Sequence, residues 1–402
     1  MDKYLILENG TVFKGKSFGY NGEDMADTIG ELVFTTKTTG YLETLSDPAY
    51  HGQIVLQTFP LIGTSGTITE DFGPGPIELK AYIVRQWCQD PSNFRCEGNL
   101  DSFLHDHKIP GLYDIDTRAL TRVIRTSGSM NAMLSSEPEL SSEMWDKLKS
   151  YKITNAVAAV CDNSNFSPGN WKTDGQCLSI RGNCESDGQC PSLRGNCEAD
   201  GQCPSLRGEG ADKNVAVWDF GDGFRSSELL IKHGCNPMIV SYKTSADNIL
   251  NKNPDGIFLT GGPGDPAEYT SIIEEVKKIC ESVSKGQNPP PIFAVGLGHQ
   301  LMALANGAKT EKMKFGNRGA NQPVKENASK RAFVTKQNHG YTVIPESLPD
   351  KAVISYTNIN DGSCEGINYS DIPAFSIQFE PTDEIMGRFM NMIEKRCENA
   401  SK

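Results

Sequence analysis

The chain has 402 residues, 37% hydrophobic and 22% charged, with a net charge of −12 at pH 7. The length allows two or three domains, and the acidic balance argues against nucleic acid or an anionic membrane surface as a partner. No stretch approaches the ~20 apolar residues of a membrane span. The N-terminus has no signal-peptide pattern, so we expect a cytoplasmic protein with reduced thiols and no membrane contact.

Residues 1–155 are predicted to form a first, β-rich domain. Short strand-like runs are separated by Gly, Asp and Pro turns: Tyr4–Leu7, Thr11–Phe13, Glu31–Thr35, Gln53–Leu56 and Leu79–Val84. Helices are expected at Leu100–His107, Thr117–Thr126 and Ser141–Ser150, and Asp116 is placed to cap the second. Nothing in this domain has the pattern of a catalytic cluster.

Residues 156–213 are predicted to be a linker that contains a repeat. The motif begins at Asp174 and recurs at Asp187 and Asp200, a period of 13 residues that carries five of the twelve cysteines. This period is too short for helical repeat units, and cysteines six or seven apart do not match zinc sites. We therefore expect a flexible insertion without a metal, with a disulfide or metal cluster as the alternative.

Residues 214–402 are predicted to form a second domain in which strands alternate with helices. Buried strands are expected at Val215–Trp218, Met238–Val240, Gly256–Leu259, Ile292–Val295 and Phe375–Phe379. This alternation predicts a mostly parallel sheet covered on both faces, with a ligand site at the carboxyl ends of its strands. Four segments are expected at those ends: Thr260–Pro266, Gly296, Gln337–Tyr341 and Gln378–Thr382.

The stretch from Pro290 to Ala305 predicts a buried strand, a sharp glycine-flanked turn and a helix. Such a junction is where α/β enzymes hold a nucleophile, and the N–H groups at the start of the helix can bind an oxyanion. The residue at the turn is Gly296, which has no side chain. The sequence therefore builds the support for a nucleophile without the nucleophile.

Several motifs in this order resemble a known family. The second domain resembles the class I glutamine amidotransferases, whose fold is flavodoxin-like, and the whole chain outside the repeat resembles the small (glutaminase) chain of carbamoyl-phosphate synthetase. The resemblance rests on Gly40–Tyr50, Phe59–Gly63, Asp116–Arg122, Gly262–Pro266, Leu297–Gln300, Gly307–Thr310, Met313–Gly316 and Gln337–Gly340. It implies two α/β domains, the N-terminal domain of that small chain followed by an amidotransferase domain.

The resemblance also implies a chemistry. In the family a Cys thiolate attacks the amide of glutamine, a His transfers the proton, a Glu orients the His, and backbone N–H groups hold the oxyanion. The ammonia passes to a large partner chain that makes carbamoyl phosphate for arginine or pyrimidine synthesis. ATP and Mg²⁺ belong to that large chain, so no cofactor or metal is expected in this one.

Carried over by position, the three triad roles fall on Gly296, Glu380 and Thr382, so all three are vacant. Three further family positions (Lys, Asn and Arg) fall on Gly223, Arg225 and Glu228, and Ala49 replaces the Ser that contacts glutamine. Cys280, Cys364, His299 and His339 are the other candidates for a nucleophile or base, and we expect none to substitute. The chain is therefore predicted to lack glutaminase activity.

The rest of the glutamine site is retained by resemblance. Gly262 and Leu297 would supply the oxyanion N–H groups, and Gly264, Gln300, Asn338, Gly340 and Tyr341 would line the site. The alternative is that these glycines persist only because their turns need a positive φ. Three hypotheses follow: a silent small chain bound to a large chain, a glutamine-binding regulator without hydrolysis, or a glutaminase with unrecognised chemistry.

Overall fold

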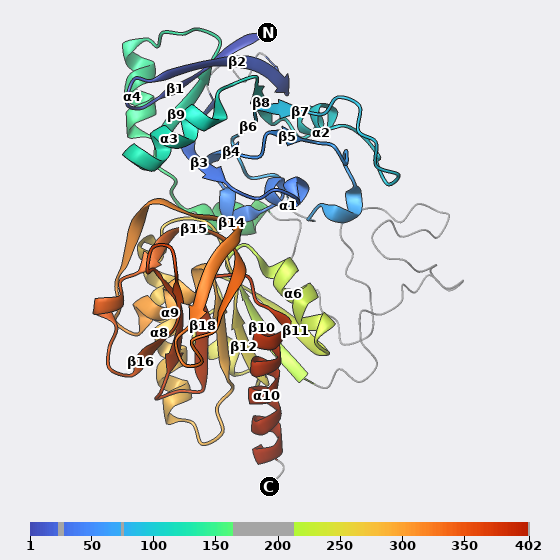
Figure 1. Ribbon diagram of the computed structural model, residues 1–402. Helices are drawn as coiled ribbons and strands as arrows, with labels where there is room; N and C mark the ends of the chain where they lie inside the picture. Colours follow the sequence, from blue (N-terminus) through green and yellow to red (C-terminus); the bar gives the residue numbers. More distant parts are fainter. Residues whose placement is uncertain (23–27, 74–75, 164–212, 401–402) are drawn as a thin grey trace.

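The computed structural model describes residues 1–22, 28–73, 76–163 and 213–400 and contains two domains (Figure 1). The predicted repeat linker lies outside these residues, apart from its first part, which forms helix α5 (Ala156–Asn163). None of the described helices combines the length and apolar character that crossing a bilayer requires.

The N-terminal domain is a closed barrel with strand order β1-β2-β8-β6-β4-β3-β9. Its strands are β1 (Asp2–Leu7), β2 (Val12–Gly19), β3 (Thr28–Thr35), β4 (Gln53–Gln57), β6 (Ala81–Ile83), β8 (Pro110–Tyr113) and β9 (Met130–Ser135). Val33 and Val55 pack into one buried cluster, and Leu32 and Ile54 into another. Both faces of β3 and β4 are therefore covered, which explains why these strands are continuously apolar in sequence.

Short helices pack around the barrel: α1 (Tyr41–Leu45), α2 (Leu100–Asp106), α3 (Thr117–Ser127) and α4 (Ser142–Ser150). The predicted cap of α3 is confirmed, because the Asp116 carboxylate accepts from the N–H groups of Arg118 and Ala119 at 3.1 and 3.0 Å. A small separate pair, β5 (Leu61–Ile62) and β7 (Gln86–Trp87), lies beside the barrel. In Figure 1, α1 lies at the boundary with the second domain.

The C-terminal domain contains a sheet of order β11-β10-β12-β13-β18-β17-β15-β14-β16. Its strands are β10 (Lys213–Asp219), β11 (Cys235–Ser241), β12 (Gly256–Leu259), β13 (Ile292–Val295), β14 (Thr310–Glu326), β15 (Ala332–Val343), β16 (Ala352–Asn358), β17 (Cys364–Tyr369) and β18 (Ala374–Ile377). From β11 to β18 the neighbouring strands are parallel, and this part of the prediction is confirmed.

Beyond β18 the sheet is antiparallel, so the prediction of a mostly parallel sheet does not hold there. The physical reason is the connection: β14 and β15 are joined by the short segment 327–331, which allows only a hairpin. The stretch Gln337–Tyr341, predicted as a turn at a strand end, instead lies inside β15. There it pairs with β14, whose irregular register at Lys312–Asn317 and Gly319–Gln322 gives the hairpin its bends.

Helices cover both faces of the sheet, as predicted: α6 (Gly223–Lys232), α7 (Ala246–Leu250), α8 (Thr270–Lys285), α9 (Leu297–Ala305) and α10 (Asp383–Ala400). Phe293 of β13 is fully buried on one face, with ring centroids 4.4 Å from Phe375 and 5.5 Å from Phe389 of α10. Ala294, the next residue, packs on the other face with Leu301 of α9. This alternation fixes the register of β13 and hence the position of the turn that follows it.

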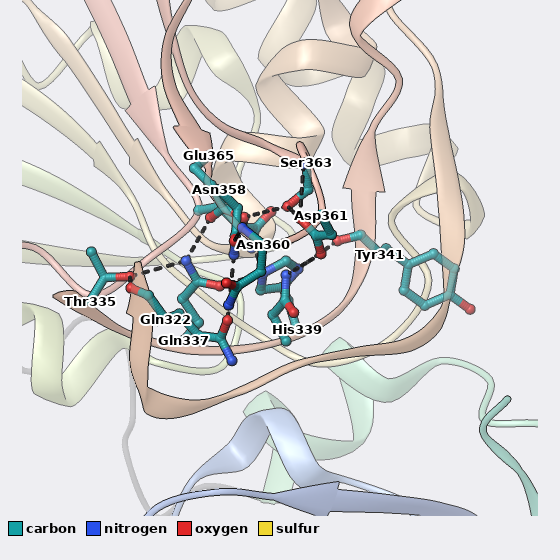
Figure 2. A network of polar contacts seen from close by, with 12 residues as sticks. Gln322, Thr335, Gln337, His339, Tyr341, Asn358, Asn360, Asp361, Ser363 and Glu365 are labelled. Carbon is teal, nitrogen blue, oxygen red and sulfur yellow. Dashed lines mark hydrogen bonds and ion pairs between the residues drawn. The ribbon is translucent and has the colours of Figure 1, made fainter. Parts of the chain in front are cut away.

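A buried polar network connects β15 to β17 and to the loop before it (Figure 2). The Glu365 carboxyl is 0% exposed and accepts from Ser363 Oγ at 2.8 Å and Gln337 Nε2 at 3.0 Å. Burial raises the pKa of Glu365 to about 8 and lowers the pKa of neighbouring His339 to about 4. Both side chains are therefore neutral near pH 7, and the network contains no buried charge at Glu365.

Replacing this carboxyl by an amide should remove a pH-dependent cost of folding. Glu365 ionises near pH 4.3 in the unfolded chain but at about 8 in the folded chain, so between these values only the unfolded state loses the proton. The free energy of unfolding therefore falls as the pH rises through this window. In urea unfolding we expect the stability of the wild type relative to Glu365→Gln to fall by about 4 kcal/mol between pH 5 and pH 9.

The matched control is Glu346→Gln, which makes the same change of charge at an exposed position. It should follow the wild type at every pH. If the curves of Glu365→Gln and the wild type stay parallel from pH 5 to pH 9, Glu365 is ionised in the folded protein and this description of the network is wrong.

Candidate functional site

The predicted strand, sharp turn and helix are present at β13 and α9. Gly296 has φ 56° and ψ −114°, a left-handed conformation that disfavours a side chain. Its N–H donates to the Ile377 carbonyl at 2.9 Å, and the Gly298 N–H donates to the Thr260 carbonyl at 3.0 Å. The neighbouring strand ends therefore hold the backbone of the turn in a shape typical of a nucleophile elbow.

The elbow leaves tight room for a Cβ, which the positive φ of Gly296 would strain. A Cβ built on Gly296 would meet only the Cα of Gly261, at 3.3 Å. By contrast, a Cβ on Gly262 would lie 2.1 Å from the Phe220 carbonyl oxygen, so only glycine fits at position 262. The N–H groups of Gly262 and Leu297 donate to no other group in the part of the chain that the structure describes. These are the two groups predicted to bind an oxyanion.

The elbow opens into a cleft of about 1550 Å³ between the two domains. The cleft brings together nearly all the predicted site residues: Ala49, Gly262, Gly264, Gly296, Leu297, Gln300, Asn338, Gly340, Tyr341 and Glu380. Thr382 is not among the residues that line it. Its hydroxyl accepts from the Ile385 N–H at 3.4 Å at the start of α10, where it acts as a cap.

Gln300 and Asn338 are fixed by hydrogen bonds. Gln300 Nε2 donates to the Tyr341 carbonyl and to Gln378 Oε1, both at 2.8 Å. Asn338 Nδ2 donates to Asp47 Oδ2 at 2.8 Å, across the domain boundary. These contacts connect the walls of the cleft to one another.

Glu380, which the resemblance assigned to the position of the family's His, makes an ion pair with Lys336. Lys336 Nζ lies 2.9 Å from Glu380 Oε2 and 2.8 Å from Glu43 Oε2 of the first domain. Burial alone would lower the pKa of Lys336, but the two carboxylates raise it overall. The position that would hold a proton-transferring imidazole is thus part of a charged bridge between domains.

The sequence analysis named Arg225 only as a departure from the family, and it did not single out Asp222 or Lys37. Arg225 Nη2 donates to the carbonyl and the hydroxyl of Ser46, both at 3.0 Å. Asp222, half-buried on the same wall, has its pKa raised to about 7 by burial. Lys37, Glu43 and Asp47 line the opposite wall. Glu43 and Asp47 lie inside the Gly40–Tyr50 motif and Lys37 lies three residues before it, which is the one sequence signal that pointed to this wall.

Of the other candidate nucleophiles and bases, Cys280, Cys364 and His299 lie away from the cleft, whereas His339 lines it. Burial raises the pKa of Cys280 to about 11 and that of Cys364 to about 12, so both thiols are protonated near pH 7. Cys364 is the first residue of β17 and is buried. His299 is fully buried, with Nδ1 2.8 Å from Ser376 Oγ. Among the described residues, the cleft is lined by no cysteine, and His339 has its Nδ1 bound to the Tyr341 carbonyl.

Two family profiles match the chain. Residues 5–134 match "Carbamoyl-phosphate synthase small chain, CPSase domain", and residues 216–396 match "Glutamine amidotransferase class-I". Together they cover more than half of the sequence.

Known proteins resemble the chain over most of its length. The carbamoyl phosphate synthase small chain of Clostridium perfringens (strain 13 / Type A) is 39% identical over 381 residues, which cover 95% of this chain and 94% of that protein. The pyrimidine-specific small chain of Bacillus subtilis (strain 168) is 37% identical over 417 residues, covering 100% of both.

Among solved structures, a glutamine amidotransferase from Thermotoga maritima covers 47% of this chain and 85% of its own, at 16% identity and a TM-score of 0.33. That likeness is too weak to contribute to the assignment, which depends on the sequence matches. On those matches, the chain belongs to the carbamoyl-phosphate synthase small chain family and carries a class I glutamine amidotransferase domain.

Proposed function

We propose that this chain is a small subunit that has lost glutamine hydrolysis and acts as the silent partner of a carbamoyl-phosphate synthase large chain, which then uses free ammonia. The observation that carries the proposal is Gly296, a residue without a side chain at an elbow whose backbone is otherwise complete. The names of the relatives, all small chains, support a large-chain partner.

The loss of the thiol alone removes most of the catalytic power of such a site. Without the nucleophile, an oxyanion hole and a binding site retain only ~10³–10⁴-fold catalysis over water. Here the base is absent as well, because Glu380 is held by Lys336 and cannot return a proton as imidazole does. Thr382 caps a helix and orients no base. Each of the three replacements therefore lowers the expected rate of glutamine hydrolysis.

The intact N-terminal barrel supports the subunit role. Within the described residues of this domain, seven strands close into a barrel around two buried apolar clusters. In the family this domain helps to dock the large chain. A glutamine-binding regulator is the second candidate, favoured by one observation: the cleft and its two unpaired N–H groups persist.

The first prediction concerns the reconstituted complex. With a large chain added, we expect carbamoyl phosphate to form when ammonium is the nitrogen donor. With glutamine as the donor, we expect carbamoyl phosphate to form no faster than when no nitrogen donor is present. The assay compares ammonium and glutamine as nitrogen donors and measures glutamate release in parallel. Glutamine-dependent turnover that thiol alkylation abolishes would contradict the proposal, because it would mean that a nucleophile acts in the cleft.

The second prediction is a rebuilt triad. The variant Gly296→Cys, Glu380→His, Thr382→Glu should release glutamate from glutamine at least about 100-fold faster than the wild type. A Cβ at position 296 would meet only the Cα of Gly261, at 3.3 Å, so the thiol can be placed there. The nucleophile and the base are restored together because neither is effective without the other. Gly296→Cys alone should gain little, because no imidazole is present to take its proton.

The matched control replaces the thiol by a hydroxyl: Gly296→Ser, Glu380→His, Thr382→Glu. It keeps the size of the side chain and lowers its reactivity, so it should stay near the wild-type rate. If the wild type already hydrolyses glutamine as fast as the rebuilt variant, the vacant triad is not the reason for inactivity and the proposed function is wrong.

A further inference from the structure

Helix α3 presents a row of arginines to the solvent. Arg118, Arg122 and Arg125 are all exposed, and their spacing of four and then three residues places them on one face of the helix. The opposite face carries Leu120 and Ile124, which are fully buried against the barrel. The helix thus has an apolar face that holds it on the barrel and an outer face, the arginine row, whose charged side chains are all positive.

The arginine row has no partner in the part of the chain that the structure describes. None of its guanidinium groups makes an ion pair with a described residue. Asp116 lies within the electrostatic range of Arg122, but its carboxylate caps the helix, and Asp114 pairs with Lys16 at 2.9 Å. The helix itself contains no acidic residue, and like charges at this spacing destabilise a helix. The row therefore calls for an explanation other than helix stability.

The helix dipole does not supply that explanation. The C-terminus of a helix attracts cations, which accounts for Arg125 in the last turn. Arg118 lies in the first turn, where the partial positive charge of the N-terminus repels a cation. Arg122 lies midway, where the dipole has little effect. Two of the three arginines therefore gain nothing from the helix that carries them.

A fourth cation, Lys314 of β14, lies beside the C-terminal end of α3. Its carbonyl accepts from the Ser129 N–H at 2.7 Å, and its Cγ would lie 3.7 Å from a Cβ on Gly128. Lys314 is exposed and makes no ion pair with a described residue. Helix α3 and β14 contact each other here, at the boundary between the domains (Figure 1). The positive surface therefore continues from the first domain to the second.

The surroundings of the row restrict the kind of partner. Guanidinium groups form two-pronged pairs with carboxylates and phosphates. The chain as a whole carries a net charge of −12, so its long-range field repels a polyanion such as nucleic acid. From Arg118 to Arg125 the row is only about 10 Å long, at the rise of an α-helix. A local patch of carboxylates on a folded protein matches this length and this field better than a long phosphate backbone does.

We propose that the arginine row of α3 docks against a patch of carboxylates on the large chain. The inference rests on the large-chain partner proposed above, and it identifies the surface that holds the silent subunit in the complex. None of the three arginines lines the cleft between the domains. Docking through the row therefore depends neither on the vacant elbow nor on a ligand in the cleft.

The test is the affinity of the full chain for a large chain, measured by surface plasmon resonance at low and at high salt. The arginine variant Arg118→Gln, Arg122→Gln, Arg125→Gln removes the charges and keeps good helix formers. At low salt we expect it to bind about 10- to 100-fold more weakly than the wild type, mainly through slower association. High salt should weaken the wild type and leave the arginine variant almost unchanged, since salt screens exposed charges. Arginine to lysine at all three positions should retain part of the affinity, because the charge remains but the two-pronged geometry is lost.

The matched control is Lys277→Gln, Lys278→Gln, Lys285→Gln, which removes as many charges from exposed positions of α8 in the second domain. It should bind the large chain as the wild type does. A thermal melt shows that each variant is folded. Equal binding by the arginine variant and the wild type would overturn the proposal. Equal weakening in the lysine control would also overturn it, because the complex would then depend on net charge and not on α3.

A DNA duplex tests the other class of partner. If it binds the wild type but not the arginine variant, while the large chain binds both, the row belongs to nucleic acid and the proposal is wrong.

The two proposals fail separately. Glutamine hydrolysis by the wild-type complex would overturn the proposed function and leave the arginine row as the docking surface. Equal binding by the wild type and the arginine variant, with hydrolysis absent, would overturn only the role of the row. A wild-type chain that does not bind the large chain would overturn both.

Discussion

The backbone of the β13–α9 turn is the constraint on which the rest of the site depends. The carboxyl ends of β12, β13 and β18 converge there, and main-chain hydrogen bonds from Gly296 and Gly298 reach strands on both sides. Gly262 approaches Phe220 too closely for any side chain. This geometry comes from the register of the sheet and from the packing of Phe293 and Ala294 on its two faces, so it does not need a nucleophile to persist.

The proposed loss of catalysis and the charge pattern of the cleft involve the same residue, Glu380. In the family's reaction, a histidine imidazole at the end of β18 transfers the proton between nucleophile and leaving group. In this chain that position contributes a carboxylate to a bridge through Lys336 to Glu43. Glu380 and Glu43 thereby connect the two domains through a single lysine.

The sequence analysis predicted those strands and helices that are identifiable from a short stretch of sequence alone. Continuous apolar runs bounded by glycine or proline identified β10, β12 and β13, and the same runs located Gly296 at the elbow. The sequence analysis did not predict strands β8, β9, β14 and β17, because contacts with strands distant in sequence decide whether they form. Strand β14, for example, is polar over most of its length, and its pairing with β15 and β16 holds it in the sheet. Most of the site glycines were identifiable from motifs. The boundary charges were not, since Lys37 and Lys336 have the residue type of a solvated surface and only tertiary packing buries them.

The two ends of the domain boundary are held by different forces. At its base, the Thr36 N–H donates to the Arg318 carbonyl at 3.0 Å, and Asn338 binds Asp47, contacts that are short-range and half-buried or buried. At its rim, the ion pairs of Lys336 and Lys312 have side chains that are 35% and 53% exposed. Counter-ions screen exposed pairs far more than buried ones, over a distance of about 8 Å at physiological ionic strength. Salt would therefore loosen the mouth of the cleft while its base stays closed, which makes ionic strength a means of controlling access to the cleft without unfolding either domain.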